Sequence, residues 1–238
     1  MPAATPESSP SPKAPVHRDI LGKKLGQKKQ LYSQHNEELI IRDFFQDKRD
    51  GVFVDVGCAW PIKNSNTYFL EHDLGWSGIG VDALPQYARS WANRRPKSRF
   101  FSYLVTDKPG PPHVFYRSDL SGRSSMDPDK AAAGKGVKYE EIRVPTITLT
   151  KLLRDNHVAR FDLLSIDIEG AELLALAGFD IARFRPQLVC IEWYHAGRDK
   201  IRAYFAAHGY ARIERYVAYD HVNDYYTPKA NLAASESP

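Results

Sequence analysis

The sequence predicts an α/β protein whose core is a mostly parallel β-sheet with helices on both faces. Short apolar runs of strand length alternate along the chain with segments whose apolar residues recur at helical spacing. The apolar runs are largely continuous, which is typical of strands buried on both faces of a parallel sheet. With 238 residues and 42% hydrophobic residues, the chain is long enough to bury one such core.

The first half of the chain has the βαβαβ pattern with which a doubly wound sheet begins. Ser65, Asn66 and Thr67 can cap the second helix, and Pro85 suits the first turn of the third. In chain order the predicted elements are a helix at 35–45, a strand at 52–56, a helix at 68–74, a strand at 78–82, a helix at 85–92 and a strand at 99–105.

The second half continues the alternation and closes on an antiparallel pair of strands. Gly178 and Gly209 mark the ends of two of its helices. The predicted elements are a strand at 139–149, a helix at 150–156, a strand at 161–167, a helix at 171–178, a strand at 187–193, a helix at 198–209 and the terminal pair formed by 210–220 and 224–228.

Three segments lack the patterns that predict regular structure. Residues 1–18 are rich in Pro, Ser and Ala and cannot offset their ordering entropy by burial, and residues 229–238 have the same character. We predict two disordered tails around a single domain at 19–228. Residues 106–137 are polar and rich in turn residues, so we predict a long loop there. Glycines flank its central part, which favours a substrate lid over simple disorder.

The positive charge is concentrated near the N-terminus. The formal net charge is +4, and residues 1–30 hold six basic and two acidic residues, so the rest of the chain sums to zero. This neutrality argues against nucleic acid as a partner, and a solvated tail is a simpler interpretation of the basic arm than an acidic partner. No apolar run approaches the ~20 residues that cross a bilayer, and there is no signal-peptide core. We therefore predict a cytoplasmic protein.

Acidic residues lie at or just beyond the ends of the predicted strands. The carboxyl ends of parallel strands share one edge of a sheet, and ligands of doubly wound sheets bind there. These residues therefore mark a common rim: Asp55, Asp82, Asp107, Asp167 and Glu192.

The turn after the first strand, DVGCAWPIKNSNT at 55–67, indicates what the rim holds. The chain has no GxxxxGK[ST] motif for a nucleoside triphosphate, and of the glycines of a dinucleotide-binding turn only Gly57 is present. An acidic turn would repel phosphates, whereas Asp55 suits a ligand with an ammonium and a sulfonium group. Asp82 is placed to accept hydrogen bonds from ribose hydroxyls. S-adenosylmethionine fits this combination.

Several motifs together resemble one family. DVGCAWPIKNSNTYFLE, GWSGIGVDALP, the TITL segment, LLSIDIEGAELLALAGF and IEWYH, in this order and spacing, are similar to the FkbM-type family of S-adenosylmethionine-dependent methyltransferases. The resemblance spans about residues 31–228, and IDIEGAE is its most specific element. It implies a Rossmann-like class I methyltransferase fold, with a mostly parallel seven-stranded sheet and an antiparallel C-terminal strand. It also implies methylation of hydroxyl groups on sugars, glycans, lipids or secondary metabolites.

The resemblance implies a set of cofactor contacts. Asp55 and Gly57 would form the turn around the methionine moiety, Asp82 would hold the ribose, and Asp107 would meet the adenine amino group. Where related methyltransferases carry further glycines, this chain has Ala59 and Pro61, so we expect a remodelled turn with polar contacts from Asn64, Ser65 and Asn66. Cys58 and Ala83 complete the predicted cofactor site. Gln34 reaches the cofactor or simply begins the leading helix.

Methyl transfer to a hydroxyl needs close positioning and removal of a proton. We predict that Asp167 orients or deprotonates the acceptor, with His195 as the alternative base and Glu169 as a further candidate. Capping of the following helix is the competing interpretation for both acids, and a surface role is equally open for His195. Asp167, Glu192 and His195 could also form a magnesium site, which we do not favour; we predict no metal.

Two competing hypotheses concern the class of protein. The first is a binding or scaffold protein that has kept the fold without the chemistry, because fold does not fix function. The second is methylation of nucleic acid, which is disfavoured further by the lack of a (D/N)PP(Y/F)-type motif. The leading helix and the terminal strands are candidate surfaces for a homodimer.

Overall fold

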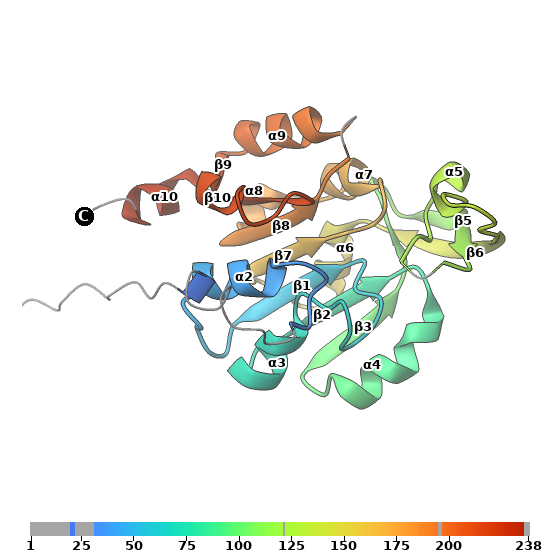
Figure 1. Ribbon diagram of the computed structural model, residues 1–238, viewed down its shortest axis with the longest axis horizontal. Coiled ribbons are helices and arrows are strands. Elements are labelled where there is room, and N and C mark those ends of the chain that lie inside the picture. Colours follow the sequence, from blue (N-terminus) through green and yellow to red (C-terminus); the bar gives the residue numbers. More distant parts are fainter. Residues whose placement is uncertain (1–19, 22–30, 121, 195–196, 236–238) are drawn as a thin grey trace, which may run out of the picture.

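The computed structural model describes residues 20–21, 31–120, 122–194 and 197–235, and its centre is a seven-stranded β-sheet (Figure 1). The strand order is β3-β2-β1-β7-β8-β10-β9. All neighbours are parallel except β10, which is antiparallel to both β8 and β9. The strands are β1 Val52–Val56, β2 Ser77–Asp82, β3 Ser98–Ser102, β7 Leu163–Ile166, β8 Leu188–Glu192, β9 Tyr210–Arg212 and β10 Asn223–Pro228. The predicted sheet is confirmed.

Helices cover both faces of this sheet, as predicted. Those of the described residues are α2 Glu37–Phe45, α3 Tyr68–Leu74, α4 Ala88–Arg94, α5 Pro128–Ala131, α6 Leu149–Asp155, α7 Glu172–Ala177, α8 Ile181–Phe184, α9 Arg198–Ala207 and α10 Lys229–Ser235, with short 3-10 helices η1 Pro85–Tyr87 and η2 Glu214–Tyr216. None of the helices in these ranges is both long and apolar enough to cross a membrane.

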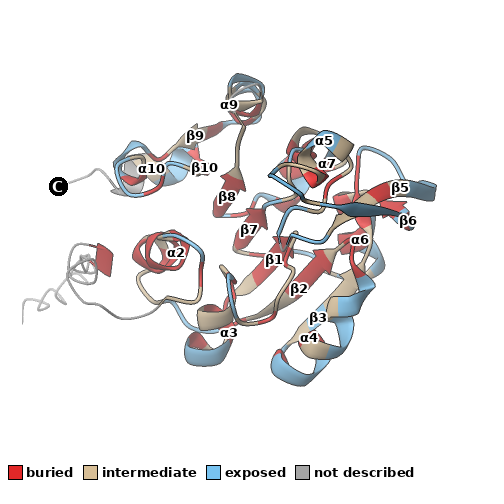
Figure 2. Cartoon of the chain, turned by 45° about the vertical axis from the view of Figure 1, so that its right-hand side comes forward, coloured by how far each residue is buried: buried red, intermediate tan, exposed pale blue. Residues whose placement is uncertain are grey.

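Successive strand residues point to opposite faces and so feed two separate cores. In β1, Phe53 packs with α2 and α3, whereas Val54 and Val56 pack with α6, α7 and α9. Figure 2 shows the central strands buried and the outer side of α4 exposed. Burial on both faces explains the continuous apolar runs in the sequence. Cys58 and Cys190 are both buried free thiols.

A second, three-stranded sheet replaces part of the predicted loop. It has the order β4-β6-β5, with β4 Leu104–Val105, β5 Gly110–Ser118 and β6 Tyr139–Ile147, and it projects with α5 from one side of the molecule (Figure 1). The prediction of a structureless segment over 106–137 is therefore wrong. Its prolines lie where the β5 register shifts, between Gly110 and His113. An edge strand tolerates proline there because its outer side has no partner strand, so the missing N–H group breaks no hydrogen bond of the sheet.

The ends of the domain differ in part from the prediction. Residues 229–235 form α10 instead of a disordered tail: alanine and leucine are strong helix formers, Leu232 packs against the core beneath α2, and Lys229 N–H donates to Gly209 O (2.9 Å). The predicted N-terminal tail at 1–18 lies outside the described residues.

Candidate active site

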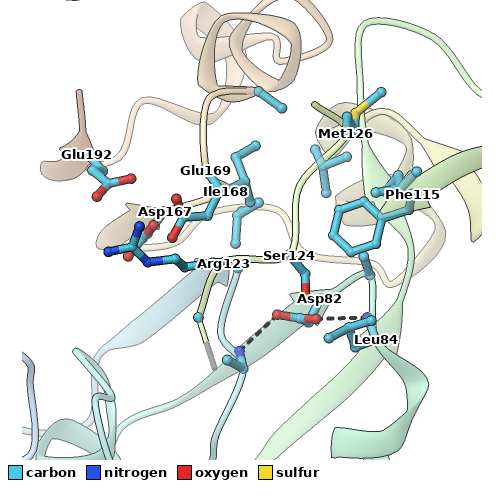
Figure 3. Close-up of a pocket in the computed structure, with 18 of the residues that line it drawn as sticks. Asp82, Leu84, Phe115, Arg123, Ser124, Met126, Asp167, Ile168, Glu169 and Glu192 are labelled. Carbon is cyan, nitrogen blue, oxygen red and sulfur yellow. Dashed lines mark hydrogen bonds between the residues drawn. The ribbon is translucent and has the colours of Figure 1, made fainter. Parts of the chain in front are cut away.

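A cavity of about 780 Å³ opens above the carboxyl ends of β1, β2, β7 and β8. This size lies within the range of small-molecule sites, and the position is the one expected for a doubly wound sheet. Its walls come from the turns after these strands and from the second sheet with the segment that follows β5 (Figure 3). The rim predicted from the strand ends therefore exists as a cavity.

Gly57 fixes the turn that follows β1. Its φ is +86°, and a Cβ at this position would lie 1.7 Å from the backbone oxygen of Asp167. The Gly57 N–H donates to Val81 O (2.8 Å), which ties the turn to β2. Only glycine permits both this conformation and this close approach of the two strand ends.

We expect Gly57→Ala to destabilise the fold by roughly 3 kcal/mol or more, because the methyl group meets backbone that cannot move aside. The matched control is Gly209→Ala, where φ is +76° and no atom lies within 4 Å of the new Cβ. That change should cost only the ~1 kcal/mol of left-handed strain. Urea unfolding of the two variants measures both values, and equal costs would contradict the close contact.

Asp82, the last residue of β2, joins the two turns that flank the cavity. Its Oδ2 accepts from Ala59 N (3.0 Å) and its Oδ1 from Leu84 N (2.8 Å), as Figure 3 shows. Burial raises the pKa of Asp82 to about 6, although the two N–H donors act in the opposite direction. The carboxylate lines the cavity and keeps lone pairs for a ligand hydroxyl.

An apolar wall lies next to Asp82. Leu84 from the turn after β2 packs with Phe115 of β5 and Met126, and all three line the cavity. Tyr103 and Leu104, which follow β3, extend this wall. The second sheet thus supplies a flat apolar surface suited to a planar ring.

Carboxyl groups gather at the other side of the cavity. Asp167 follows β7 and Glu192 ends β8; since Ile166 pairs with Ile191, the two acids lie side by side. Asp167 is open to the cavity, whereas Glu192 Oε2 is buried without a hydrogen-bond partner in the described part of the chain. Figure 3 shows both beside Glu169 and Arg123.

Burial and the neighbouring carboxyls raise the pKa values of Asp167 and Glu192. Desolvation raises the pKa of Asp167 well above its ordinary value, and the carboxyls of Glu192 and Glu169 add to the shift. Desolvation, with the charge of Glu169, raises the pKa of Glu192 to about 7. Two carboxyls side by side in a desolvated site do not both ionise readily. Above about pH 7 the pair therefore shares one proton.

Glu169 is held by its own contacts rather than by helix capping. Tyr194 Oη donates to Glu169 Oε2 (2.5 Å), and Ser125 Oγ donates to the Glu169 carbonyl oxygen (2.9 Å). Glu172, the first residue of α7, instead accepts from the N–H groups of Ile168 and Gly170 and so fixes the turn before the helix. The competing interpretation of Glu169 as a cap is therefore wrong.

Two cations reach this side from the segment after β5. Lys130 Nζ lies 3.4 Å from the centroid of the Tyr194 ring, and it occupies the space that a side chain at Gly170 would need. Desolvation raises the pKa of Glu169, while the hydrogen bond from Tyr194 and the charges of Lys130 and Arg123 act in the opposite direction. The segment predicted as a lid is thus docked on the carboxyl cluster.

The predicted site residues divide into three groups. Those that line the cavity are Gln34, Gly57, Asp82, Ala83, Asp167 and Glu169. Those that do not line the cavity formed by the described residues are Asp55, Cys58, Asn66 and Asp107. His195 lies outside the described residues.

The second group supports the cavity from behind. Asp55 is buried, and its Oδ2 accepts from Thr67 Oγ1 (2.7 Å), so its carboxylate does not face the ligand as predicted. Cys58 is buried beneath Gly80, and Asn66 Nδ2 donates to Ser165 Oγ (3.1 Å). These residues shape the turn and do not contact the ligand space.

Asp107 is exposed, and its predicted contact with adenine is wrong. The prediction treated 99–105 as one strand, but β3 ends at Ser102 and the chain then enters the second sheet as β4. The residues that reach the cavity here are therefore Tyr103, Leu104 and Val105.

Several lining residues escaped the sequence analysis, among them Phe115, Arg123, Met126, Lys130 and Tyr194. Tyr194 lies two residues beyond Glu192, so the strand-end rule could have found it. The remaining four depend on β5 and the segment that follows it. No group of three or more metal-ligating side chains occurs in the described ranges; a magnesium site that includes His195 would extend beyond them.

The comparisons agree with this architecture. The methyltransferase FkbM domain matches residues 49–212, well over half of the chain, so the chain belongs to this methyltransferase family. The resemblance drawn from the sequence is confirmed, and the sheet is that of a Rossmann-like class I methyltransferase. A comparison with curated proteins gives no match.

The solved structures that match this chain are distant from it in sequence. They include a TehB-like SAM-dependent methyltransferase from Corynebacterium glutamicum (13% identity, 82% of this chain and 89% of that chain, TM-score 0.46). A precorrin-6y C5,15-methyltransferase from Geobacter metallireducens is 12% identical, with 78% of this chain and 76% of that chain covered and a TM-score of 0.43. A SAM-dependent methyltransferase from Geobacter sulfurreducens in complex with S-adenosyl-L-homocysteine is 10% identical, with 78% of this chain and 68% of that chain covered and a TM-score of 0.38.

Proposed function

We propose that this methyltransferase uses S-adenosylmethionine to methylate a hydroxyl group of a sugar, glycan or secondary metabolite. The observation that carries the proposal is the carboxyl of Asp167, which is open to the cavity and lies beside Glu192, whose Oε2 is buried. A hydroxyl acceptor must lose a proton, so a positioned base is the feature that such a reaction needs. Trp60, which lines the cavity, offers an aromatic face of the kind that stacks on sugars.

The cavity residues fit S-adenosylmethionine. Gly57 lines the cavity at the β1 turn, where the methionine moiety would lie. Asp82 can accept from both ribose hydroxyls, and the apolar wall of Leu84, Phe115 and Met126 suits the adenine ring. Gln34 and Asn64 add amide groups at the same opening.

The acid pair can remove the acceptor's proton. When bound, S-adenosylmethionine supplies an electrophilic methyl group on a sulfonium. Asp167 faces the cavity and contacts the acceptor hydroxyl. It takes that proton on one oxygen while the proton that the pair already shares moves to Glu192, so the pair ends with one proton more. Glu169, Tyr194 and Lys130 hold the neighbouring wall.

A cytoplasmic location, a homodimer and the absence of nucleic-acid partners stay predictions, with no further support. A non-catalytic scaffold is the alternative function, and it differs in the loss of acceptor chemistry rather than of the fold.

The test begins with calorimetric titration of S-adenosylmethionine and S-adenosylhomocysteine into the purified protein, followed by a screen of glycosides and hydroxylated metabolites for methyl transfer. We expect micromolar binding and turnover with at least one hydroxyl acceptor. Asp167→Asn should lose ~100-fold or more in turnover with S-adenosylhomocysteine affinity within about twofold of the unchanged protein. Binding without turnover on any hydroxyl, or full activity of Asp167→Asn, would refute the proposed chemistry.

A further inference from the structure

Beyond Gly57, the turn at 57–67 lacks the further glycines of related methyltransferases but still adopts conformations that favour glycine. Ala59 has φ +37° and Asn64 has φ +55°. Such residues cost about 1–3 kcal/mol each and persist only where the surroundings hold them. Trp60, Lys63 and Asn64 of this turn line the cavity. Something outside the turn must therefore fix its shape.

Arg95, which follows α4, lies completely buried behind the turn. Its Nη1 donates to Pro61 O (3.1 Å) and Ser65 Oγ (3.3 Å). Its Nη2 donates to Thr67 O (3.2 Å) and Thr67 Oγ1 (3.0 Å), and its Nε donates to Glu71 Oε2 (2.7 Å). A guanidinium has five N–H donors in a fixed plane, and here each has an acceptor.

The contacts continue to both ends of the turn. Thr67 Oγ1 donates to Asp55 Oδ2 (2.7 Å), which connects the end of the turn to β1. Trp91 of α4, whose ring stacks against the Arg95 guanidinium (4.4 Å), donates from Nε1 to Ala59 O (2.8 Å). The strained Ala59 is thus held through its carbonyl from α4 and through its N–H from Asp82.

Buried charge makes this arrangement rigid. Arg95, Glu71 and Asp55 are 0%, 4% and 5% exposed, so each charged group depends on the others for its solvation. Lysine would keep the charge but not the planar fork that reaches Pro61, Ser65 and Thr67 together.

We propose that Arg95 is the positioning residue of the cofactor turn, which it holds in the shape that glycines give to related enzymes. This inference rests on the proposed function, because it takes the turn to contact the methionine moiety of S-adenosylmethionine. Arg95 itself does not line the cavity and acts only through the turn. The consequence is selective: the methionine part of the ligand depends on Arg95, and the adenosine part does not.

The test compares two ligands that differ in this part. S-adenosylhomocysteine carries the amino acid, whereas 5′-methylthioadenosine lacks it. Calorimetry on Arg95→Lys and Thr67→Val should show S-adenosylhomocysteine affinity lowered roughly tenfold and methylthioadenosine affinity changed less than about twofold. Asp82→Ala, in contrast, should weaken both ligands.

The control for general destabilisation is Asp162→Ala. Asp162 bonds Lys48, the Val52 N–H and Gln187 at the opposite, amino end of the strands. This variant should lower the unfolding midpoint and leave both affinities unchanged.

Each outcome of these titrations supports or contradicts the proposed role of Arg95. If Arg95→Lys does not fold, Thr67→Val carries the test, since it removes one hydroxyl from the same network. Equal weakening of both ligands, or no weakening of either, would overturn the role of Arg95 while Asp82→Ala still reports on the proposed cofactor site. Failure of the unchanged protein to bind either ligand would overturn the proposed function and this inference with it.

Discussion

Asp82→Ala should lower the affinity for S-adenosylhomocysteine on the order of 100-fold. The substitution removes the acceptor that the proposed ribose contact needs, and hydrogen bonds to a charged group contribute about 1.5–3 kcal/mol each. It also frees the N–H groups of Ala59 and Leu84, on which both flanking turns depend. Calorimetric titration at pH 8, with the fold checked by circular dichroism, measures the loss.

The pH dependence of binding gives an independent check. The pKa of Asp82 is raised to about 6, so its carboxylate is present above that pH and lost below it. Ribose hydroxyls donate to the carboxylate form, and affinity should therefore be constant above about pH 7 and fall as the pH drops through about 6. Asp82→Ala should lack this fall.

Asp107→Ala is the matched control for Asp82, because Asp107 is an exposed acid that also follows a strand of the same half of the chain. Its affinity should equal that of the unchanged protein. An Asp82→Ala variant that binds as well as this control would place the ribose elsewhere.

The main sheet could be predicted because its signals are local. Each central strand is buried on both faces and therefore appears as a continuous apolar run, as in 52–56 and 163–166. In the second sheet, the pattern of 139–149 predicted β6, but β5 gave no such signal. β5 is an edge strand with Pro111 and Pro112 at its start, and it is stabilised by pairing with β6, more than twenty residues away.

The site was predictable where a side chain lies at a strand end. Asp82 and Asp167 follow this rule and reach the cavity. Asp55 lies one residue before the end of β1, and its side chain meets Thr67 at the start of α3 instead. The strand-end rule gives the edge of the sheet, but the direction of each side chain depends on its neighbours in space.

The role of Arg95 could not be predicted from the sequence. In the sequence it is one of several basic residues in ARSWANRRPKSR at 88–99, a pattern typical of the outer face of a helix. In the structure it is completely buried with five hydrogen bonds. Its partners span residues 61–71, and no local pattern indicates that they surround one guanidinium.

The second large effect is expected from Glu192→Gln, measured as the pH profile of turnover with an acceptor from the screen. In the unchanged protein, Glu192 must be ionised to take the proton that Asp167 passes on. Its pKa of about 7 predicts that the rate rises roughly tenfold per pH unit below 7 and levels off above it.

Removal of this carboxylate should change both the plateau and its position. Glutamine cannot take the proton, so Asp167 must act alone, and the plateau should fall about tenfold or more. The charge of Glu192 is one cause of the raised pKa of Asp167, so its loss lowers that pKa, and the rise in rate should follow Asp167 and move away from its position near pH 7. A merely structural role would lower the rate without this shift. The control is Glu214→Gln, which changes an exposed acid outside the cavity and should leave the pH profile unchanged. If Glu192→Gln also keeps the pH profile of the unchanged protein, the acid pair is excluded as the proton acceptor.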